Sequence, residues 1–534
     1  MKRILTFLLV FALCFTMSAC KDEKTDGNDS VVTDSTVQTE SEKEDSNTTS
    51  DASSSQTSTT SSEKNTSTTD KNATSNKNTS TSDKNTVTSN KNTASDKNTA
   101  SDKNTTNKNG LDFGGKTVTF IYEYQPSNEY GIDPSRDLEL DRIKELNKKY
   151  NVKIVMKKGA ANYNEAIVSS IAAGAPIGNV IRINGNKNYD FIKAGLCADL
   201  TPAMKSTGIN MTASHYNKRV NKYYNVNGKQ YVASVIIPQE PDAYELWFYN
   251  KDVLSEIGYK SDYIQGLYKK GKWTWAEATK LFAAATKKSA NGTITRYALG
   301  DSMAYRLVTT LSLSNGGKIG GVNSKGAPTV NLGSANVRAA MQQVYEWGSV
   351  NKYIAPTQGD ETYTKFKKGE LFMCAAPAGQ AKQFYNSGVN FGVVYAPKGP
   401  NGKKNVAPVN AGNAFMIPVT YQKDAAKYLI ILDELYAPYK DITREEILKN
   451  DAISYFSDVD SWNIYKESTL NESVRVNDDF TVYNLEWVKP EFGTVCLNLV
   501  KGTATPGVVV EKYNDQYQAL LNDLFKGYAL TGIK

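Results

Sequence analysis

The chain has 534 residues and a formal net charge of +7, from 63 lysines and arginines against 56 aspartates and glutamates. A charge this small for the length, without a basic stripe interleaved with aromatic residues, gives no sign of a nucleic-acid-binding protein. The single histidine excludes histidine-based zinc sites, and the five cysteines include no CxxC pair. We therefore expect no metal and no cofactor.

The first 19 residues have the features of an export signal. Two basic residues precede an apolar run over residues 4–15, which is too short to span a bilayer comfortably. The run ends in the sequence MSAC at residues 17–20, which resembles a bacterial lipobox, although methionine stands where leucine, valine or isoleucine is usual. We expect Cys20 to become the lipid-bearing N-terminus; the alternative is ordinary signal-peptidase cleavage near Ala19.

Residues 20–110 consist almost entirely of Ser, Thr, Asn, Asp and Lys, and the pentapeptide SDKNT recurs at 82–86, 95–99 and 101–105. This repeat is too short and too polar to bury a core. We interpret the segment as a disordered tether behind the lipid anchor. A low-complexity insertion without a tethering role would have the same composition.

Strands and helices alternate at the start of the folded region, residues 111–534. Three β-rich runs are separated by two segments with apolar residues at helical spacing. This order predicts a parallel sheet covered by helices, with a ligand site at the carboxyl ends of the strands. The expected strands are 116–122, 152–156 and 179–183, and the expected helices are 135–150 and 162–173.

The same alternation continues downstream, and a region of this length is too long for one core, so we expect two lobes. The chain is expected to cross between them near 240–250 and 375–415. Residues 440–534 are expected to be mainly helical, with no lobe assigned. The other expected strands are 244–249, 371–375, 390–394 and 415–418, and the other expected helices are 276–287, 337–350 and 423–436.

Several short motifs have local structural explanations. Asn250 and Asp252 can cap the helix that follows them. Thr274 and Glu277 fit a Thr-x-x-Glu capping box. Three glycines, Gly316, Gly399 and Gly402, suit turns that need a positive φ. We expect these residues to build the fold and not to contact a ligand.

Six segments in order resemble family 1 extracellular solute-binding proteins, the sugar-type receptors of ABC importers. Two of them depart from the family pattern: Lys272-Trp273 replaces a proline, and Phe372 stands in place of alanine. The segments are VNGKQY at 226–231, LWFYNKD at 246–252, KWTWAE at 272–277, SNGG at 314–317, FKKGELFM at 366–373 and YAPKGPNG at 395–402.

The resemblance implies an α/β fold of the two-lobed periplasmic-binding-protein-like type II, with a ligand in the cleft between lobes that close around it. It implies a receptor and not an enzyme: a monomer that binds a carbohydrate, an oligosaccharide in particular, and delivers it to ABC permease subunits in the membrane. With Cys20 lipidated, the protein would be extracytoplasmic and anchored to the outer face of the cell membrane.

Saccharide recognition uses aromatic faces, carboxylates and amides, so candidate ligand contacts are side chains of these types at predicted strand ends and crossovers. The competing interpretation of each aromatic is packing in the core. The candidates are Glu123, Tyr124 and Gln125 after the first strand, Asn184 and Asn186 after the third, Tyr244, Glu245 and Trp247 at the first crossover, Gln380 beside Pro377 and Gly379, and Asn410 and Asn413 around Gly412.

Other functions have weaker support. The histidine, His215, lies in TASHY, without a nucleophile elbow, and we expect it on the surface or in a loop. No phosphate-binding loop motif occurs, although paired carboxylates for glycoside hydrolysis stay open. Cys197, Cys374 and Cys496 are expected to be buried free thiols. The alternatives to a saccharide receptor are the same fold binding a peptide or polyol, a ligand-presenting sensor component, and a surface carbohydrate-active enzyme.

Overall fold

The computed structural model describes residues 110–532, apart from 127, 132, 239, 242, 244, 325 and 410–412. The described residues belong to one compact unit, Thr99–Lys534. The predicted signal peptide, Cys20 and the tether up to residue 109 lie outside the described residues, and they stay predictions. Among the described helices, none is both long and apolar enough to cross a membrane.

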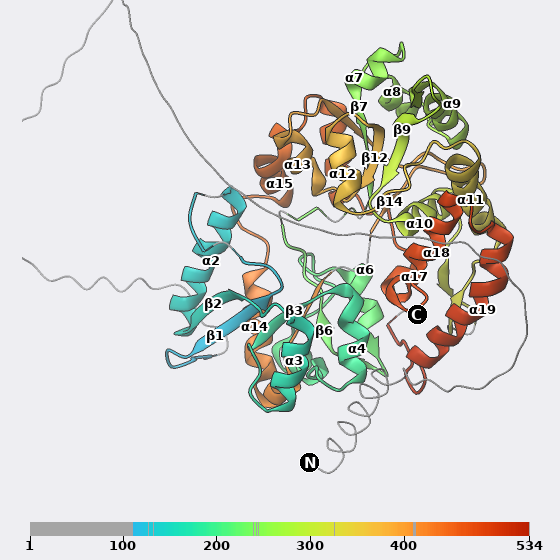
Figure 1. Ribbon diagram of the computed structural model, residues 1–534. Coiled ribbons are helices and arrows are strands. Elements are labelled where there is room, and N and C mark those ends of the chain that lie inside the picture. Colours follow the sequence, from blue (N-terminus) through green and yellow to red (C-terminus); the bar gives the residue numbers. More distant parts are fainter. Residues whose placement is uncertain are drawn as a thin grey trace, which may run out of the picture. The chain divides into compact units, whose positions relative to one another are not determined.

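The first lobe contains the predicted parallel sheet (Figure 1). Strand β1 pairs in parallel with β2 on one side and with β3 on the other. Two later strands extend the sheet in the antiparallel sense, β15 beside β3 and β6 beside β15. The spatial order is β2 (Lys153–Lys158), β1 (Thr117–Tyr122), β3 (Val180–Ile183), β15 (Ala414–Met416) and β6 (Val232–Ala233).

Helices cover both faces of this sheet, and their ends follow the local sequence. Helix α2 begins after Asp133, whose side chain accepts from the Arg136 amide, and Pro134 occupies its first turn. It ends at Asn151, which has a φ of 47°. The helices of this lobe are α2 (Pro134–Tyr150), α3 (Tyr163–Ala172), α4 (Asn188–Lys193), α5 (Thr201–Thr207), α6 (Lys218–Asn221) and α14 (Ala425–Leu435).

The second lobe is built on another five-stranded sheet, which is mixed. Three of its strands, β7, β12 and β13, are buried on both faces, as their nearly continuous apolar sequences require. β12 pairs in parallel with β9 and antiparallel with β7. The spatial order is β13 (Phe391–Val394), β7 (Leu246–Asn250), β12 (Leu371–Ala376), β9 (Ile294–Asp301) and β8 (Lys287–Lys288).

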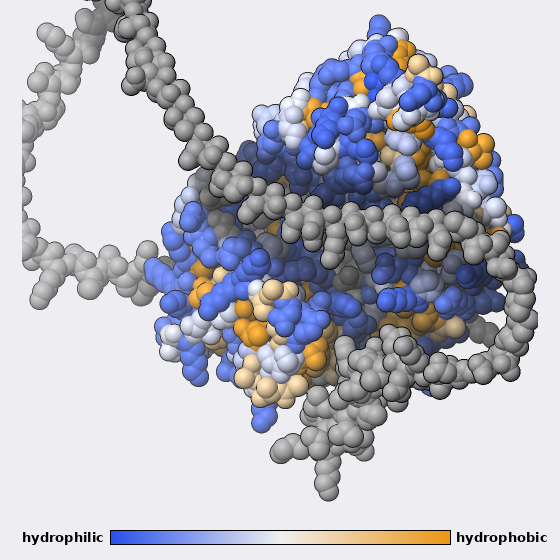
Figure 2. Space-filling view, in the orientation of Figure 1, coloured by the Kyte–Doolittle hydropathy of each residue, from blue (hydrophilic) through white to orange (hydrophobic). Residues whose placement is uncertain are grey.

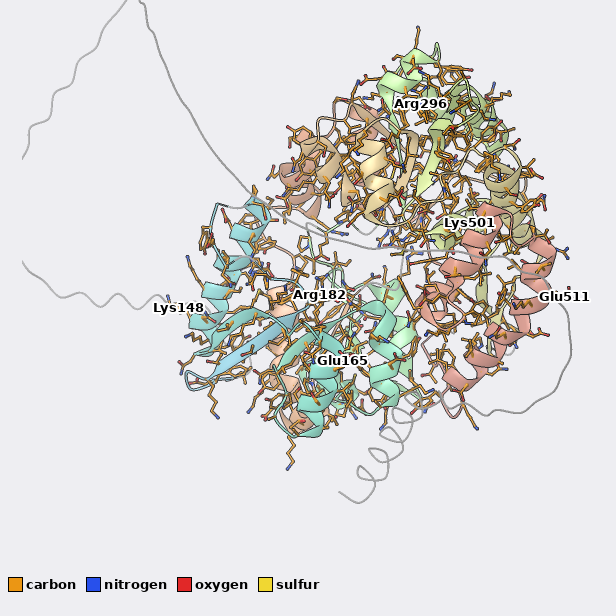
Figure 3. The ribbon with its side chains drawn as sticks, viewed as in Figure 1. Lys148, Glu165, Arg182, Arg296, Lys501 and Glu511 are labelled. Atoms are coloured by element: carbon orange, nitrogen blue, oxygen red, sulfur yellow. The ribbon has the colours of Figure 1, made fainter. Side chains whose placement is uncertain are left out.

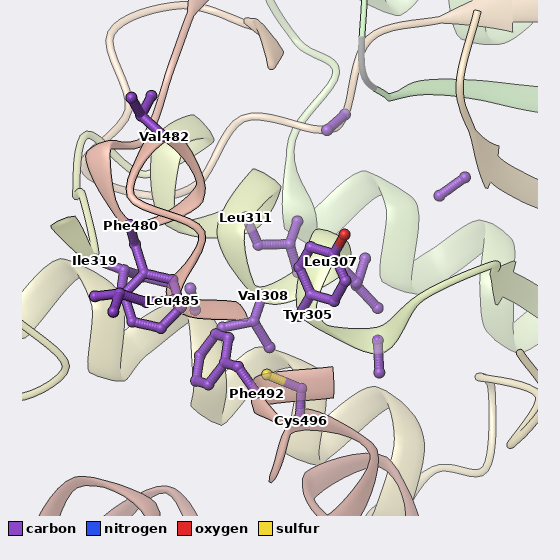
Figure 4. Close-up of a cluster of buried hydrophobic side chains, with 14 of the residues drawn as sticks. Tyr305, Leu307, Val308, Leu311, Ile319, Phe480, Val482, Leu485, Phe492 and Cys496 are labelled. Carbon is purple, nitrogen blue, oxygen red and sulfur yellow. The ribbon is translucent and has the colours of Figure 1, made fainter. Parts of the chain in front are cut away.

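Most helices of the second lobe pack around this sheet, and α10 against α18 forms the centre of an apolar cluster (Figure 4). Tyr305, Val308 and Leu311 of α10 meet Phe492 and Cys496 of α18 in that cluster. The helices are α7 (Lys251–Glu256), α8 (Tyr263–Lys269), α9 (Trp275–Ala285), α10 (Ala304–Ser314), α11 (Ala335–Tyr345), α12 (Asp360–Lys367), α13 (Gln380–Asn386) and α18 (Phe492–Lys501).

The C-terminal part is helical, as predicted, and most of it belongs to the second lobe. Leu448 and Trp462 share a core with β13, while α19 packs on β11 and α11. The last residues return to the first lobe, where the Ala529 carbonyl accepts from the Asn227 amide. The helices here are α15 (Arg444–Ala452), α16 (Val459–Leu470), α17 (Asp479–Val482) and α19 (Pro506–Leu524).

Short elements join the larger ones. They include three two-stranded ribbons and several single turns of 3-10 helix. The ribbons are β10 (Gly320–Val322) with β11 (Pro328–Val330), β14 (Ala407–Pro408) with β16 (Arg475–Val476), and β4 (Asn225–Val226) with β5 (Lys229–Gln230). The turns are η1 (Gly185–Lys187), η2 (Lys222–Tyr224), η4 (Val419–Asp424), η5 (Ile453–Tyr455) and η6 (Leu485–Trp487).

Two segments that carry the chain between the lobes lie side by side. One runs from β6 to β7 and the other from β14 to β15, and Ala243 forms an antiparallel bridge with Val409 between them. Ala243 lies within the range of the crossover predicted near 240–250. Within the range of the crossover predicted at 375–415, β13 and β14 belong to the second lobe and β15 belongs to the first.

The structure corrects three local predictions. Gly316 has a positive φ, but Gly399 and Gly402 do not. These two glycines are needed for space. A Cβ on Gly399 would lie 2.5 Å from Asn315 Oδ1, and a Cβ on Gly402 would lie 1.9 Å from the Ser314 carbonyl oxygen. Thr274 caps α9, accepting from the Glu277 amide, whereas the Glu277 carboxylate pairs with Lys280 instead of closing a capping box. The segment predicted as a helix over 337–350 is an α-helix as far as Tyr345, and its last five residues, Glu346–Val350, form a π-helical turn instead.

Candidate functional site

A polar pocket of about 260 Å³ lies between the two lobes, and both supply its walls. The paired crossover segments contribute Ala243 and Val409, so the pocket adjoins the place where the chain passes from lobe to lobe. The lining residues from the first lobe and the crossovers are Arg182, Asn217, Ser234, Val235, Ile237, Glu240, Pro241, Ala243, Val409, Asn413 and Phe415, and those from the second lobe are Arg306, Pro377 and Arg475.

Arg182 is the pocket's most constrained cation. It is the third residue of β3, is 7% exposed, and lies on the side of the first lobe that faces the second (Figure 3). Its Nη2 donates to Glu240 at 2.8 Å, and its guanidinium lies 5.1 Å from the centre of the Tyr124 ring. Burial opposes its charge, but Glu240 and the nearby tyrosines outweigh burial and hold the pKa of Arg182 above its usual value.

The second lobe supplies two further arginines. Arg306 lies in the first turn of α10, where its Nη1 donates to the Ser302 hydroxyl at 3.0 Å. Arg475 lies in β16, is 4% exposed, and its Nη1 donates to Glu472 at 2.7 Å. Because a guanidinium carries its donors in a fixed planar fork, these contacts orient each group in the pocket wall.

A second pocket, of about 320 Å³, shares the first turn of α10 with the polar pocket. Its distinctive feature is Trp487, which is 42% exposed and packs edge-on against Tyr305 with ring centres 5.9 Å apart. An exposed indole held by a buried aromatic ring offers a flat apolar face to a ligand. The lining residues are Ser302, Met303, Tyr305, Gln358, Gly359, Glu486, Trp487, Glu491, Gly493 and Thr494.

Three buried carboxyl groups interact with Arg306, and one of them, Glu486, lines the second pocket. Burial raises the pKa of Glu245 to about 7, although a hydrogen bond from Trp247 and the charge of Arg306 lower it. Burial also raises the pKa of Asp301, helped by the charge of Glu245, and raises the pKa of Glu486. Burial thus disfavours the charged form of each of these carboxyls.

Two of the predicted residues lie at the polar pocket, Asn413 in its lining and Tyr124 against the lining residue Arg182, while two others bond to each other. Glu123 and Asn184, which follow β1 and β3, meet in a hydrogen bond of 2.6 Å from the amide to the carboxylate. Tyr124 is 46% exposed and stacks on Arg182, and burial of its hydroxyl raises its pKa to about 12. Asn413 lines the pocket and accepts from the Ser234 hydroxyl through its carbonyl oxygen.

Other predicted residues lie elsewhere. Trp247 is fully buried between Phe282 and Trp347, and Glu245, 1% exposed, accepts from its indole at 2.9 Å, so both belong to the core of the second lobe. Gln125 is exposed and bonds to the next residue's carbonyl, and Gln380 begins α13, beside the pocket residue Pro377. Tyr244 and Asn410 lie outside the described residues, and Asn186 is described in its backbone alone.

His215 and the cysteines carry no catalytic arrangement among the described residues. His215 is in a loop, which is one of the two predicted placements, and its side chain is 12% exposed and hydrogen-bonds to Asp433 at 2.8 Å. The three cysteines predicted to be buried free thiols are confirmed as such. No group of three or more potential metal ligands occurs in the described part of the chain.

The residues that the sequence analysis missed are the three arginines and Trp487. Arg182 lies inside a predicted strand. Side chains of a strand alternate between its two faces, so a charged residue there is expected to point to solvent and not to line a pocket. Arg475 and Trp487 lie in the C-terminal region, whose lobe was unassigned. A search for cationic or aromatic residues within otherwise apolar elements could have found Arg182 and Arg306.

Comparison with known proteins defines the class. The family model for bacterial extracellular solute-binding proteins matches residues 139–430, more than half of the chain. The chain therefore belongs to the bacterial extracellular solute-binding protein family, a family of binding proteins. A search of curated proteins found no match.

Solved structures show the same two-lobed fold at low sequence identity. The ABC substrate-binding protein Lmo0181 from Listeria monocytogenes, in complex with cycloalternan, matches 76% of this chain and 98% of its own at 17% identity, with a TM-score of 0.51. The match to the GacH receptor of Streptomyces glaucescens, studied with acarbose, covers 77% of this chain and 99% of the GacH chain at 17% identity, with a TM-score of 0.53. The match to UgpB from Mycobacterium tuberculosis, in complex with glycerophosphocholine, covers 76% of this chain and 98% of the UgpB chain at 15% identity, with a TM-score of 0.53.

Proposed function

We propose that this protein is the substrate receptor of an ABC importer and binds a saccharide, an oligosaccharide in particular, between lobes that close around it. The observation that carries the proposal is the pair of adjoining pockets at the first turn of α10. One pocket presents an exposed indole and the other presents polar groups from both lobes, which are the two kinds of surface a sugar needs. The ligands in the structures of Lmo0181 and GacH support this class.

In this proposal Glu123, Tyr124, Asn184 and Asn413 contact the ligand from the first lobe, and Trp487 stacks on a sugar ring from the second. The protein acts as a monomer with ABC permease subunits as its membrane partners. Cys20 carries the lipid that anchors it to the outer face of the cell membrane, with residues 21–110 as the tether. Release of a Cys20→Ala chain from the membrane fraction would support the anchor, and continued membrane association of that chain would count against it.

The first experiment is a thermal-shift screen of the purified chain against mono- and oligosaccharides, with peptides, amino acids and polyols as controls. A ligand that binds the folded state alone adds stability of RT ln(1 + [L]/Kd), about 2.7 kcal/mol at a hundredfold excess over Kd. We expect a shift with one saccharide class. A shift with peptides or polyols alone would replace the saccharide assignment, and turnover of a glycan would favour the surface-enzyme alternative.

The Trp487→Ala variant tests the stacking role. Loss of the indole should weaken saccharide binding by up to about tenfold, as expected for an aromatic contact. Tyr385 on α13 is 47% exposed and lines neither pocket, so Tyr385→Ala is the matched control. Isothermal titration of both variants should show weaker binding in the first alone; equal affinity in both would remove Trp487 from the site.

A further inference from the structure

The polar pocket carries an excess of positive charge among its described lining residues. Three arginines line it, Arg182, Arg306 and Arg475, and Glu240 is the one carboxylate among the described residues of that lining. The arginines come from β3, α10 and β16, elements of both lobes that are far apart in sequence. Lobe packing, and not a local charge run, therefore brings these cations together.

The arginines are held in place before any ligand arrives. Arg182 is 7% exposed and Arg475 is 4% exposed, and each has a carboxylate partner, Glu240 and Glu472 respectively. Burying a guanidinium is costly unless its donors are satisfied. The Nε of Arg182 is buried and makes no hydrogen bond within the described residues. A buried cation in a pocket wall with an unused donor is suited to an anionic oxygen.

We propose that the bound saccharide is acidic, and that Arg182, Arg306 and Arg475 bind its carboxylate, sulfate or phosphate group. This inference rests on the proposed function and narrows it. A planar guanidinium matches each of these anions through paired hydrogen bonds. Because the arginines come from both lobes, the anion would join the lobes and contribute to closure.

The surroundings of Arg306 support this proposal. Three carboxyl groups interact with it, Glu245, Asp301 and Glu486, and their negative charges would oppose the positive charge of Arg306 if all three were ionised. Burial raises the pKa of all three carboxyls. Burial therefore disfavours the negative charges that would oppose Arg306.

The test compares matched neutral and acidic ligands on the full chain by isothermal titration. The probes are galactose and galacturonate disaccharides, and glucose with glucose 6-sulfate and glucose 6-phosphate, which separate the three anion types. We expect at least one acidic probe to bind about tenfold or more tightly than its neutral parent, since hydrogen bonds between charged groups are the strong ones. High salt should reduce this preference.

Two variants assign the preference to the pocket. Arg306→Gln and Arg475→Gln should each lower affinity for the acidic probe about tenfold or more, and by a larger factor than they lower affinity for the neutral parent. Arg338, exposed on α11 and outside both pockets, provides the control, because Arg338→Gln removes the same charge from another place. Thermal melts of each variant establish that it is folded.

The outcomes separate this inference from the proposed function. Binding of a neutral saccharide as tight as, or tighter than, its acidic counterpart would overturn the acidic-ligand inference and leave the saccharide receptor standing. An acidic preference that Arg306→Gln and Arg475→Gln leave intact would also overturn it. Failure of every saccharide to bind would overturn both.

Discussion

At the scale of single residues, Glu245 shows how burial sets a chemical property. Its side chain is 1% exposed, and burial raises its pKa to about 7 against an ordinary value of 4.5, while the Trp247 indole and Arg306 act in the opposite direction. The folded chain therefore binds more protons than the unfolded chain between about pH 4.5 and 7. The stability due to Glu245 is fully present below pH 4.5 and is lost as the pH rises through 7.

The variant Glu245→Gln tests this dependence. The amide keeps an acceptor for the Trp247 indole and removes the ionisable group, so the variant should gain stability over the wild type as the pH rises from 5 to 8. At about 1.4 kcal/mol per pKa unit the gain is about 3 kcal/mol. Urea unfolding at pH 5 and pH 8 measures it; an equal difference at both values would contradict the raised pKa.

Glu256 supplies the opposite case for comparison. Hydrogen bonds from Arg296 and then Lys287 lower the pKa of Glu256 to about 2. Its contribution to stability is present above its ordinary pKa of 4.5 and is lost as the pH falls towards 2. Glu256→Gln should therefore destabilise the chain at neutral pH, and this loss should shrink in acid.

At the scale of elements, the turn at residues 315–317 (NGG) packs against the loop at residues 397–402 (PKGPNG), and glycines allow the close contact. The Gly316 φ of 75° requires glycine for its backbone conformation, whereas Gly402 is needed for space. A Cβ on Gly402 would lie 1.9 Å from the Ser314 carbonyl oxygen at the end of α10. Asn315 completes the contact by accepting from the Asn401 amide at 2.9 Å.

Alanine substitutions distinguish a glycine required for space from one that is not. Gly402→Ala should destabilise the chain by about 1–3 kcal/mol, because backbone has to move. Gly266→Ala in α8, where a Cβ meets nothing within 4 Å, should stabilise it by up to about 1 kcal/mol. Denaturant unfolding measures both; a neutral Gly402→Ala would show that the loop moves freely.

At the scale of the whole molecule, two packed lobes are joined by crossover segments that pair at Ala243 and Val409, beside the polar pocket. The visible surface of both lobes is mainly hydrophilic, with apolar residues in small groups (Figure 2). Crossover segments of this kind can act as hinges about which one lobe rotates on the other. A ligand that touches both lobes stabilises the closed arrangement by its differential affinity.

Fluorescence transfer between labels on the two lobes would detect closure. Labels on Lys148→Cys in α2 and Lys367→Cys in α12 should approach each other when ligand saturates the chain, with Cys14 and Cys20 changed to serine. The other three cysteines are buried, and burial raises their thiol pKa, so they react poorly. Lys148→Cys with Lys205→Cys, both in the first lobe, should show no change. Identical behaviour of both pairs would argue against closure.

The sequence by itself determined the elements and the family. Alternating runs over 116–183 placed the parallel sheet, Asn250 and Thr274 marked helix starts, and six ordered motifs indicated the fold, because these signals are local in the chain. The tertiary structure alone decided which side chains reach the pocket. Trp247 and Tyr124 are both aromatic residues near strand ends, yet packing buries the first and exposes the second. Arg182, Arg306 and Arg475 meet for the same reason: their proximity depends on how two lobes pack, and no local pattern encodes it.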